Sequence, residues 1–282
     1  MTAVRLTRGE WVQAIRPLAP DQAVAAIGDV HGQDDLFAAL RAELARDLSR
    51  AAQATFLQLG DVVDRGPRSL AALRRARQGL PGVECVTLMG NHEDRMLRAL
   101  LTGDDREAAL WLDFGGGATL AETGLSAADP DWRERLRLAL GARMMDWLVG
   151  LPQAHRVGDL LFVHAGIDPS VPLDRQDSET MMWVRKPFLQ SPGPYPGNVA
   201  VIHGHTPQPA VALDHPHRIN LDTGAFRTGV LSGLLVEGDR MQVVQALRDP
   251  LDGSACGPEG ADRSLRPPRA RPKARSGFQA KG

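Results

Sequence analysis

The chain has 282 residues, of which 43% are hydrophobic and 24% charged, with a formal net charge of −1. This composition is ordinary for a globular protein, and no apolar run approaches the ~18 residues that a membrane-spanning helix needs. Charges interrupt the N-terminal segment where a secretion signal would be apolar, so we expect neither export nor a membrane partner. Cys85 lies in an apolar run and Cys256 in a Gly/Pro-rich segment. This disfavours a disulfide and fits a reducing, cytoplasmic setting.

Apolar runs and amphipathic stretches alternate in the first third of the chain. Three short apolar runs predict β-strands at residues 23–29, 54–61 and 85–91. Helical spacing of apolar side chains predicts three helices at residues 33–48, 67–78 and 92–101. Pro67 would lie in the first turn of the second helix, where proline is favoured. The β-α-β-α-β order indicates a largely parallel sheet with helical crossovers.

The strand pattern stops between residues 102 and 150, where tryptophans occur among helical patterns. We expect a helical cap inserted into a domain that spans residues 1–250, with the run Gly115–Gly117 as a hinge. Strands are predicted again at residues 160–166, 198–205, 218–224, 231–238 and 240–247. The last two would form a hairpin, because Gly238 and Asp239 make a favourable turn.

Residues 251–282 differ in composition from the rest. Seven of the 33 Lys and Arg residues follow Asp262 and no acidic residue does, so residues 1–262 carry 26 basic and 34 acidic side chains. A segment rich in Pro and Arg with few apolar side chains predicts disorder, because it cannot bury enough surface to offset its ordering entropy. The alternative is an electrostatic arm for acidic partners. The acidic remainder disfavours nucleic acid as a partner.

Five predicted strands end in side chains that commonly bind metals. The motifs are GDVHG (28–32), GDVVDRG (60–66), GNHE (90–93), HAG (164–166) and HGHT (203–206). In open α/β sheets, sites form outside the carboxyl ends of the strands. Several carboxylates and imidazoles gathered there would be costly to bury without a cation. The pattern therefore predicts a metal site.

The glycine spacing distinguishes the two histidines of the last motif. Asp29, Asp61 and Asn91 each follow a glycine, which lets the backbone turn sharply where the strand ends. By the same rule His205, which follows Gly204, is the expected ligand. His203 would lie within the strand and pack or hydrogen-bond nearby.

In this order, the five motifs resemble the phosphoprotein phosphatase family of calcineurin-like metallophosphoesterases, over residues 24 to about 245. WVRKPF (183–188) and NLDTGA (220–225) further resemble its bacterial members, which include Ser/Thr and Tyr protein phosphatases and symmetrical diadenosine tetraphosphate hydrolases. The resemblance implies a layered α/β (α+β) fold, with a central β-sandwich flanked by helices and a helical cap insertion.

The resemblance also implies two divalent metal ions that share a bridging Asp61. Its ligands would be Asp29, His31 and Asp61 for metal one, and Asp61, Asn91, His164 and His205 for metal two. An all-N/O donor set suits Mn²⁺, our first expectation, with Fe or Zn²⁺ as alternatives. Pro207 replaces a final histidine found in the wider superfamily, so metal one would be the more open site.

Four further residues would act on the substrate. By resemblance His92 is the general acid and Asp64 holds its ring, which would fix the tautomer. Arg65 and Arg185 would bind phosphate oxygens, since guanidinium groups suit bidentate contacts. Two more acidic residues have less defined roles. Glu93 is expected to be a structural residue at a helix start, and Asp222 is either a support for a ligand or purely structural.

We therefore expect a dinuclear-metal phosphomonoesterase that hydrolyses phosphoproteins by metal-hydroxide attack, as a Ser/Thr or dual-specificity protein phosphatase. The alternative is a symmetrical bis(5'-nucleosyl)-tetraphosphatase with the same core, acting on a phosphorylated small molecule. A remote alternative is a non-catalytic binding module that uses the basic tail. The sequence leaves the physiological substrate, the native metal and the oligomeric state open.

Overall fold

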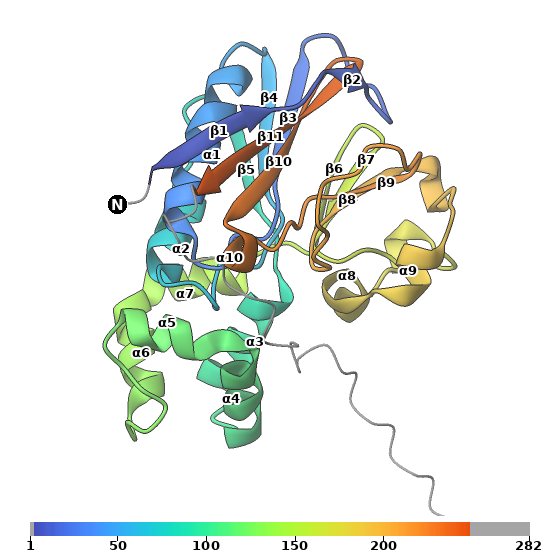
Figure 1. Ribbon diagram of the computed structural model, residues 1–282. Helices are drawn as coiled ribbons and strands as arrows, with labels where there is room; N and C mark the ends of the chain where they lie inside the picture. The colour runs from blue at the N-terminus through green and yellow to red at the C-terminus, as the bar shows by residue number, and fades with distance from the viewer. Residues whose placement is uncertain (1–2, 249–282) are drawn as a thin grey trace, which may run out of the picture.

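Two β-sheets packed face to face form the centre of the fold (Figure 1). The computed structural model describes residues 3–248, so the predicted basic tail lies outside the described residues. The larger sheet contains β1 (Val4–Arg8), β2 (Val12–Gln13), β3 (Gln22–Ile27), β4 (Gln53–Gln58), β5 (Glu84–Thr87), β10 (Val230–Glu237) and β11 (Arg240–Arg248). The smaller sheet contains β6 (Ala154–Val157), β7 (Leu160–Val163), β8 (Ala200–His203) and β9 (Arg218–Asn220).

The larger sheet has the order β1-β11-β10-β3-β4-β5, with β2 paired to β11, and the smaller has the order β6-β7-β8-β9. The run β3-β4-β5 is parallel, as is β7-β8-β9. The crossovers in the first run are α1 (Asp34–Leu48) and α2 (Ser69–Arg77), and α3 (Asn91–Leu101) follows β5. The predicted parallel arrangement and the β10–β11 hairpin are therefore present. The carboxyl ends of β3, β4 and β5 meet at one edge.

Apolar side chains from both sheets fill the space between them. Leu57 of β4, Phe162 of β7 and Ile202 of β8 have no exposed surface and belong to the same buried cluster. This is the β-sandwich that the family resemblance implied. Because β3, β4, β7 and β8 all contribute to the cluster, the packing of the two sheets brings the ends of strands from both sheets together.

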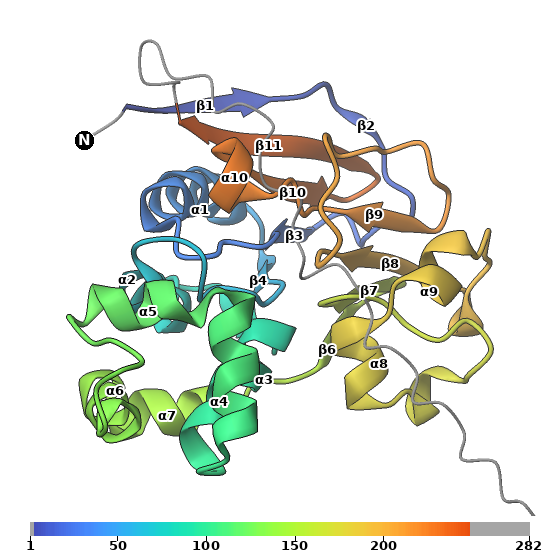
Figure 2. The ribbon, with the colours of Figure 1, turned by 60° about the horizontal axis from the view of Figure 1, so that its bottom comes forward.

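Helices cover the outer faces of the sandwich (Figures 1 and 2). The buried cluster on the outer face of the larger sheet includes Phe37 and Leu40 of α1. Phe188, fully buried in α9 (Lys186–Gln190), packs on the smaller sheet near α8 (Ser178–Trp183). The remaining helices within residues 3–248 are α4 (Asp105–Trp111), the short η1 (Leu112–Gly116), α5 (Gly117–Glu122), α6 (Trp132–Leu140), α7 (Ala142–Val149), η2 (Leu173–Arg175), η3 (Pro196–Asn198) and α10 (Ala225–Thr228). No helix within residues 3–248 is long and apolar enough to cross a membrane.

We refer to residues 102–150 as the cap insertion. Its helices α4 to α7 lie together against α2 and α3, away from the smaller sheet (Figure 2). In the printed views this group forms the lower part of the molecule. The chain leaves the larger sheet through α3 and enters the smaller sheet at β6 only after the cap insertion is complete.

Three details differ from the sequence-based expectations. Pro67 is not in the first turn of α2, which begins at Ser69, because the loop before it is tied by the Arg68 amide to the Gly32 carbonyl. The edge strand β1 was not predicted, although Val4 and Leu6 alternate with polar residues. The short strands β2 and β6 were also missed, since two to four residues carry too little periodicity.

The two sheets approach each other closely at Gly28, just after β3. A Cβ atom on this residue would lie 2.4 Å from the carbonyl oxygen of Leu221. We therefore expect Gly28→Ala to lower the free energy of unfolding by about 1–3 kcal/mol, as overpacking typically does. Gly79→Ala is the matched control, because a Cβ there would contact nothing within 4 Å. Chemical denaturation measures both, and equal effects would contradict the close-approach explanation.

Candidate active site

The loops at the carboxyl ends of the strands have an unusual backbone. Six non-glycine residues within 3–248 have positive φ, and five of them lie in this region: His31, Asp61, Asp64, Arg65 and His205, with φ between 45° and 71°. This region of φ is disfavoured for residues with a Cβ atom. Such outliers persist only where the surrounding contacts enforce them, and they cluster at functional sites.

Glu93 enforces the turn after β4. Its carboxylate is fully buried and accepts hydrogen bonds from the amides of Asp61 (2.8 Å), Val62 (2.8 Å) and Val63 (3.1 Å). It also accepts one from the amide of Gly90, at the start of α3 (3.1 Å). The expected role as a helix-start residue is therefore too narrow, because Glu93 also shapes the loop that carries Asp61.

Asp61 lies between two groups of imidazoles. Its Oδ2 atom is 3.6 Å from Nε2 of His31 and 3.9 Å from Nε2 of His92. Its Oδ1 atom is 3.4 Å from Nε2 of His164. The ligand-type atoms of Asp61, His31 and His92 lie within 4.8 Å of one another, as do those of Asp61, His164 and His205. One carboxylate thus belongs to both groups.

Backbone carbonyls orient two of these rings. Nδ1 of His31 donates to the carbonyl of Val63 (2.9 Å), and Nδ1 of His164 donates to that of Leu59 (2.8 Å). A proton on Nδ1 leaves the lone pair on Nε2, the nitrogen that faces Asp61 in both residues. This is the usual orientation of a metal-binding histidine.

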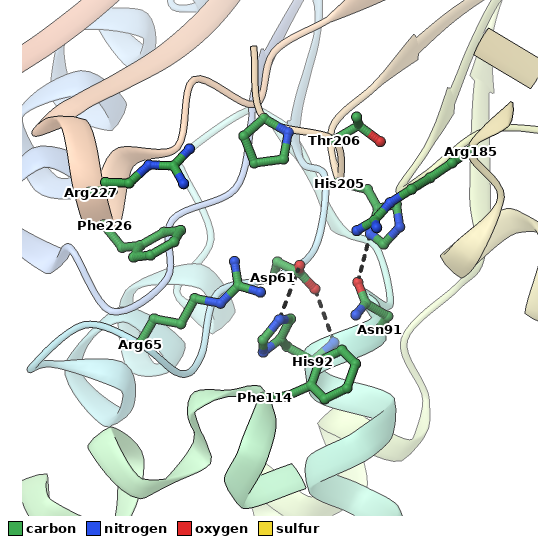
Figure 3. A pocket seen from close by; sticks show the side chains of 11 residues that line it. Asp61, Arg65, Asn91, His92, Phe114, Arg185, His205, Thr206, Phe226 and Arg227 are labelled. Atoms are coloured by element: carbon green, nitrogen blue, oxygen red, sulfur yellow. Dashed lines mark hydrogen bonds and ion pairs between the residues drawn. The ribbon is translucent and has the colours of Figure 1, made fainter. Parts of the chain in front are cut away.

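Asn91 and Asp29 complete the groups. Oδ1 of Asn91 is 2.9 Å from both Nε2 of His164 and Nδ1 of His205. Figure 3 shows the contact with His205. The carboxylate of Asp29 accepts from the amide of His205 at 3.1 and 3.2 Å. Gly204 has to be small, because a Cβ there would lie 2.0 Å from an Asp29 oxygen. The six residues expected as ligands are therefore neighbours and all are buried.

The electrostatics of the buried groups fit bound cations. Burial and the nearby Asp222 carboxylate raise the pKa of Asp29 well above its usual value. Burial lowers the pKa of His31 and of His205 well below the usual value, which keeps both rings neutral. The buried Nε2 atom of His205 has no hydrogen-bond partner among the described residues. Neutral imidazoles, carboxylates and an unpaired nitrogen are what divalent cations of intermediate hardness bind.

His92 is paired with Asp64 behind the metal-type ligands. Nδ1 of His92 lies 2.9 Å from Oδ2 of Asp64, and both side chains are fully buried. Burial raises the pKa of Asp64 to about 8, against the lowering effect of Thr119 and Trp111, which donate to it. The second ring nitrogen of His92 faces Asp61. The pair thus has the geometry of an imidazole oriented by a carboxylate.

A cavity of about 240 Å³ opens over these groups (Figure 3). Its lining includes the expected phosphate-binding residues Arg65 and Arg185. It also includes Phe114 of the cap insertion and Phe226 and Arg227 of α10, which the sequence did not indicate. The sequence feature that could have indicated Phe226 and Arg227 is their position directly after the NLDTGA motif. The guanidinium of Arg65 lies 4.7 Å from the ring centre of Phe226.

His203 is separate from this cluster. It is fully buried, its ring packs edge-on against Phe188 at 5.0 Å, and Nδ1 contacts the carbonyl of Gly204 (3.1 Å). Burial lowers its pKa to about 3, so the ring is neutral. Asp222 is also buried, and its carboxylate accepts from the amide of Gly224 (2.8 Å). Neither belongs to the two groups that share Asp61.

A family model described as calcineurin-like phosphoesterase matches residues 23–230. The chain is a calcineurin-like metallophosphoesterase. Members of this family are hydrolases of phosphoric esters, and the His/Asp groups around Asp61 could hold metal ions.

Two curated relatives of this metallophosphoesterase carry different activities in their names. A symmetrical bis(5'-nucleosyl)-tetraphosphatase from Acidovorax ebreus is 35% identical over 158 residues, which cover 52% of this chain but only 45% of that protein. Serine/threonine-protein phosphatase 1 from Salmonella typhimurium is 26% identical over 211 residues, covering 74% of this chain and 89% of that protein. The structure of a cold-active protein-tyrosine phosphatase from Shewanella has a TM-score of 0.51 at 20% identity over 80% of each chain, a likeness of fold.

The contrast between His205 and His203 can be tested by metal content. His205→Ala removes a buried nitrogen from the group around Asp61 and Asn91, so we expect loss of bound metal and of turnover. His203→Ala should retain its metals and lower only the melting temperature, because it leaves a cavity beside Phe188. Elemental analysis of the folded variants measures this. Equal metal loss in both would contradict the assignment.

Proposed function

We propose that the protein hydrolyses phosphoric esters with two divalent cations that share the carboxylate of Asp61. The observation that supports this is the division of its two oxygens, with Oδ1 toward His164 and Oδ2 toward His31. A carboxylate with imidazoles facing each oxygen suits a pair of cations roughly 3.5–4 Å apart. The ligands would be Asp29, His31 and Asp61 on one side, and Asp61, Asn91, His164 and His205 on the other.

Such a cation pair would lower the pKa of coordinated water and polarise the phosphoryl oxygens. We propose Mn²⁺ as the native metal, with Fe or Zn²⁺ as the alternatives, because the donors are nitrogen and oxygen without a thiolate. The residues of the chain then have to bind the phosphoryl group, orient it and deliver a proton to the leaving group.

Arg65 and Arg185 are proposed to bind the phosphoryl oxygens that face the cavity. Their side chains enter the cavity from opposite sides, and Asp61, Asn91 and His205 lie between them (Figure 3). Arginine suits this role because its planar fork can make two parallel hydrogen bonds to one phosphate. The backbone of Arg65 is held in place, since its amide donates to the carbonyl of Gly115 (3.1 Å).

His92 is proposed to protonate the leaving group from Nε2. Its Nδ1 is hydrogen-bonded to Asp64, so Nε2 is the nitrogen directed toward Asp61 and the cavity. The Asp64 carboxylate fixes the ring and stabilises its protonated form. The His92 ring also lies close to that of Phe114 in the cap insertion, with 5.7 Å between ring centres.

Our first candidate substrate is a dinucleoside tetraphosphate, cleaved symmetrically. The A. ebreus relative supports it, together with a third guanidinium in the cavity wall, that of Arg227. Arg227 is exposed and forms no ion pair that the described residues provide, so it is available to a second phosphate of a polyphosphate chain. The rings of Phe114 and Phe226 offer apolar surface for a base.

The second candidate is a phosphoprotein, supported by the S. typhimurium relative, which this chain matches over most of both lengths. The buried His92–Asp64 pair favours the same candidate. A seryl alkoxide is a poor leaving group and needs a proton, whereas a nucleoside diphosphate leaves with little assistance.

The leaving group should therefore determine the effect of losing His92. We expect His92→Asn to reduce kcat by about 10²–10⁴-fold on a phosphoserine peptide and far less on p-nitrophenyl phosphate or diadenosine tetraphosphate, whose leaving groups are more acidic. Steady-state kinetics with the Mn²⁺-loaded protein measure this, and metal content is the control. Equal slowing of all three substrates with both metals bound would refute the acid role.

Arg227 should separate the two candidate substrates. If a dinucleoside tetraphosphate is the substrate, Arg227→Ala should lower kcat/KM for diadenosine tetraphosphate about 10-fold, the typical size of one lost charge-assisted hydrogen bond. Hydrolysis of p-nitrophenyl phosphate should change less than about twofold, since it has a single phosphate. Arg77→Ala, on the exposed side of α2, is the control. An unchanged kcat/KM for the tetraphosphate would argue for the phosphoprotein.

A further inference from the structure

The carboxylate of Asp64 is held by two side chains of the cap insertion. Nε1 of Trp111 donates to both oxygens, at 3.1 Å to Oδ1 and 3.0 Å to Oδ2. Oγ1 of Thr119 donates to Oδ1 at 2.7 Å. Asp64 and Thr119 are both fully buried, as is Trp111. The contacts join α4 and α5 of the cap insertion to the loop after β4, across 47 and 55 residues of sequence.

Further hydrogen bonds, through Ser69, set the direction in which the Thr119 hydroxyl donates. The amide of Asp64 donates to Oγ of Ser69 (2.9 Å), and that oxygen lies 3.0 Å from Oγ1 of Thr119. Each hydroxyl has a single hydrogen, and a carboxylate is the stronger acceptor. Thr119 therefore donates to Asp64, and Ser69 donates to Thr119. The result is a closed ring of hydrogen bonds from the Asp64 amide back to its own Oδ1.

These bonds determine which oxygen remains for His92. Oδ1 accepts from Thr119, Trp111 donates between the two oxygens, and Oδ2 faces Nδ1 of His92 at 2.9 Å. A carboxylate without such partners can rotate about its last bond, and the imidazole would follow it. Trp111 is in turn held by the ring of Trp132, stacked at 5.6 Å.

Other residues of the cap insertion contact the loop after β4 and the start of α2. Glu122 accepts hydrogen bonds from the amides of Leu70 (2.7 Å) and Ala71 (3.3 Å), at the start of α2. The Gly115 carbonyl binds the amide of Arg65 (3.1 Å). Gly116 lets Trp111 approach, because a Cβ there would lie 2.3 Å from the indole ring. Of the glycine run expected as a hinge, Gly115 and Gly116 pack against Arg65 and Trp111.

We propose that Thr119 and Trp111 are positioning residues for the general acid, so that docking of the cap insertion completes the Asp64–His92 pair. The proposal rests on the acid role proposed above for His92. Neither side chain lines the cavity, so their effect on catalysis passes through Asp64. Substrate-facing Phe114 belongs to the same insertion, which links substrate contact and acid orientation in one segment.

Thr119→Val tests the proposal, because it removes the hydroxyl at nearly constant volume, while Thr119→Ser keeps it. We expect Thr119→Val to lower kcat on a phosphoserine peptide at least about 10-fold, within the range that general acid catalysis supplies, and to leave p-nitrophenyl phosphate nearly unchanged. Thr119→Ser should restore the wild-type ratio. Thr123→Val removes a hydroxyl from the end of the same helix, where it bonds the Leu120 carbonyl (2.7 Å), and should keep that ratio.

A spectroscopic readout is independent of turnover. The proton on Nδ1 of His92, bonded to a buried carboxylate, should give a far-downfield proton resonance in protein loaded with diamagnetic Zn²⁺, assigned by its absence in His92→Asn. Thr119→Val should shift or broaden it, and Trp111→Phe should do so as well. Metal content and the melting temperature identify a variant that fails to fold or to load. If Thr119→Val is such a variant, Trp111→Phe carries the comparison, because it removes the indole donor to Asp64 and keeps an aromatic ring.

The outcomes separate the two proposals. If Thr119→Val keeps both the substrate ratio and the His92 resonance of Thr123→Val, the positioning role is wrong, even if His92→Asn remains selective for the phosphoserine peptide. If His92→Asn slows all substrates equally, the acid role itself is wrong. A change of resonance in Thr119→Val would in that case still support the orientation of His92 by the cap insertion.

Discussion

The buried carboxylate of Glu93 is the constraint on which the site depends. It accepts hydrogen bonds from three consecutive amides after β4 and from the amide of Gly90, so it joins two strand ends through one side chain. Burial and the neighbouring Asp61 raise its pKa to about 7, which reflects the cost of placing this charge here. Four backbone donors offset much of that cost. These hydrogen bonds fix the backbone of the loop, and they thereby stabilise the left-handed conformation of Asp61.

Many ionisable groups share one buried region beside this loop, and burial and neighbouring charges shift their pKa values. Burial and Asp222 raise the pKa of Asp29, while the carboxylate of Asp61 raises that of His164 to about 10 even though burial acts in the opposite direction. Buried ionisable groups with such shifted pKa values destabilise a fold unless a cation is bound. The cation offsets this cost because metal ligands have to be deprotonated. Binding of metal to the native state would therefore stabilise the protein as well as activate it.

Segments outside the sandwich contribute side chains both to the cavity and to the contacts of Asp64. The cap insertion contributes Phe114 to the cavity and Thr119 and Trp111 to Asp64, while α10 contributes Arg227 from the other side. The strand ends of the sandwich thus supply the metal-type ligands, and the added helices contribute side chains to the wall of the cavity (Figure 3). The proposal that these helices determine the substrate is consistent with the different activities named for the two relatives.

The sequence by itself determined the fold class, the parallel strand order around β3 to β5 and the location of the metal-type residues. The reason is local: side chains at strand ends are read directly from short motifs, and the glycine before His205 distinguishes it from His203. Only the tertiary structure decided the partners of Asp64 and the place of Arg227 in the cavity wall. No local pattern records those contacts, because they join segments separated by dozens of residues and arise only when the cap insertion and α10 pack around the strand ends.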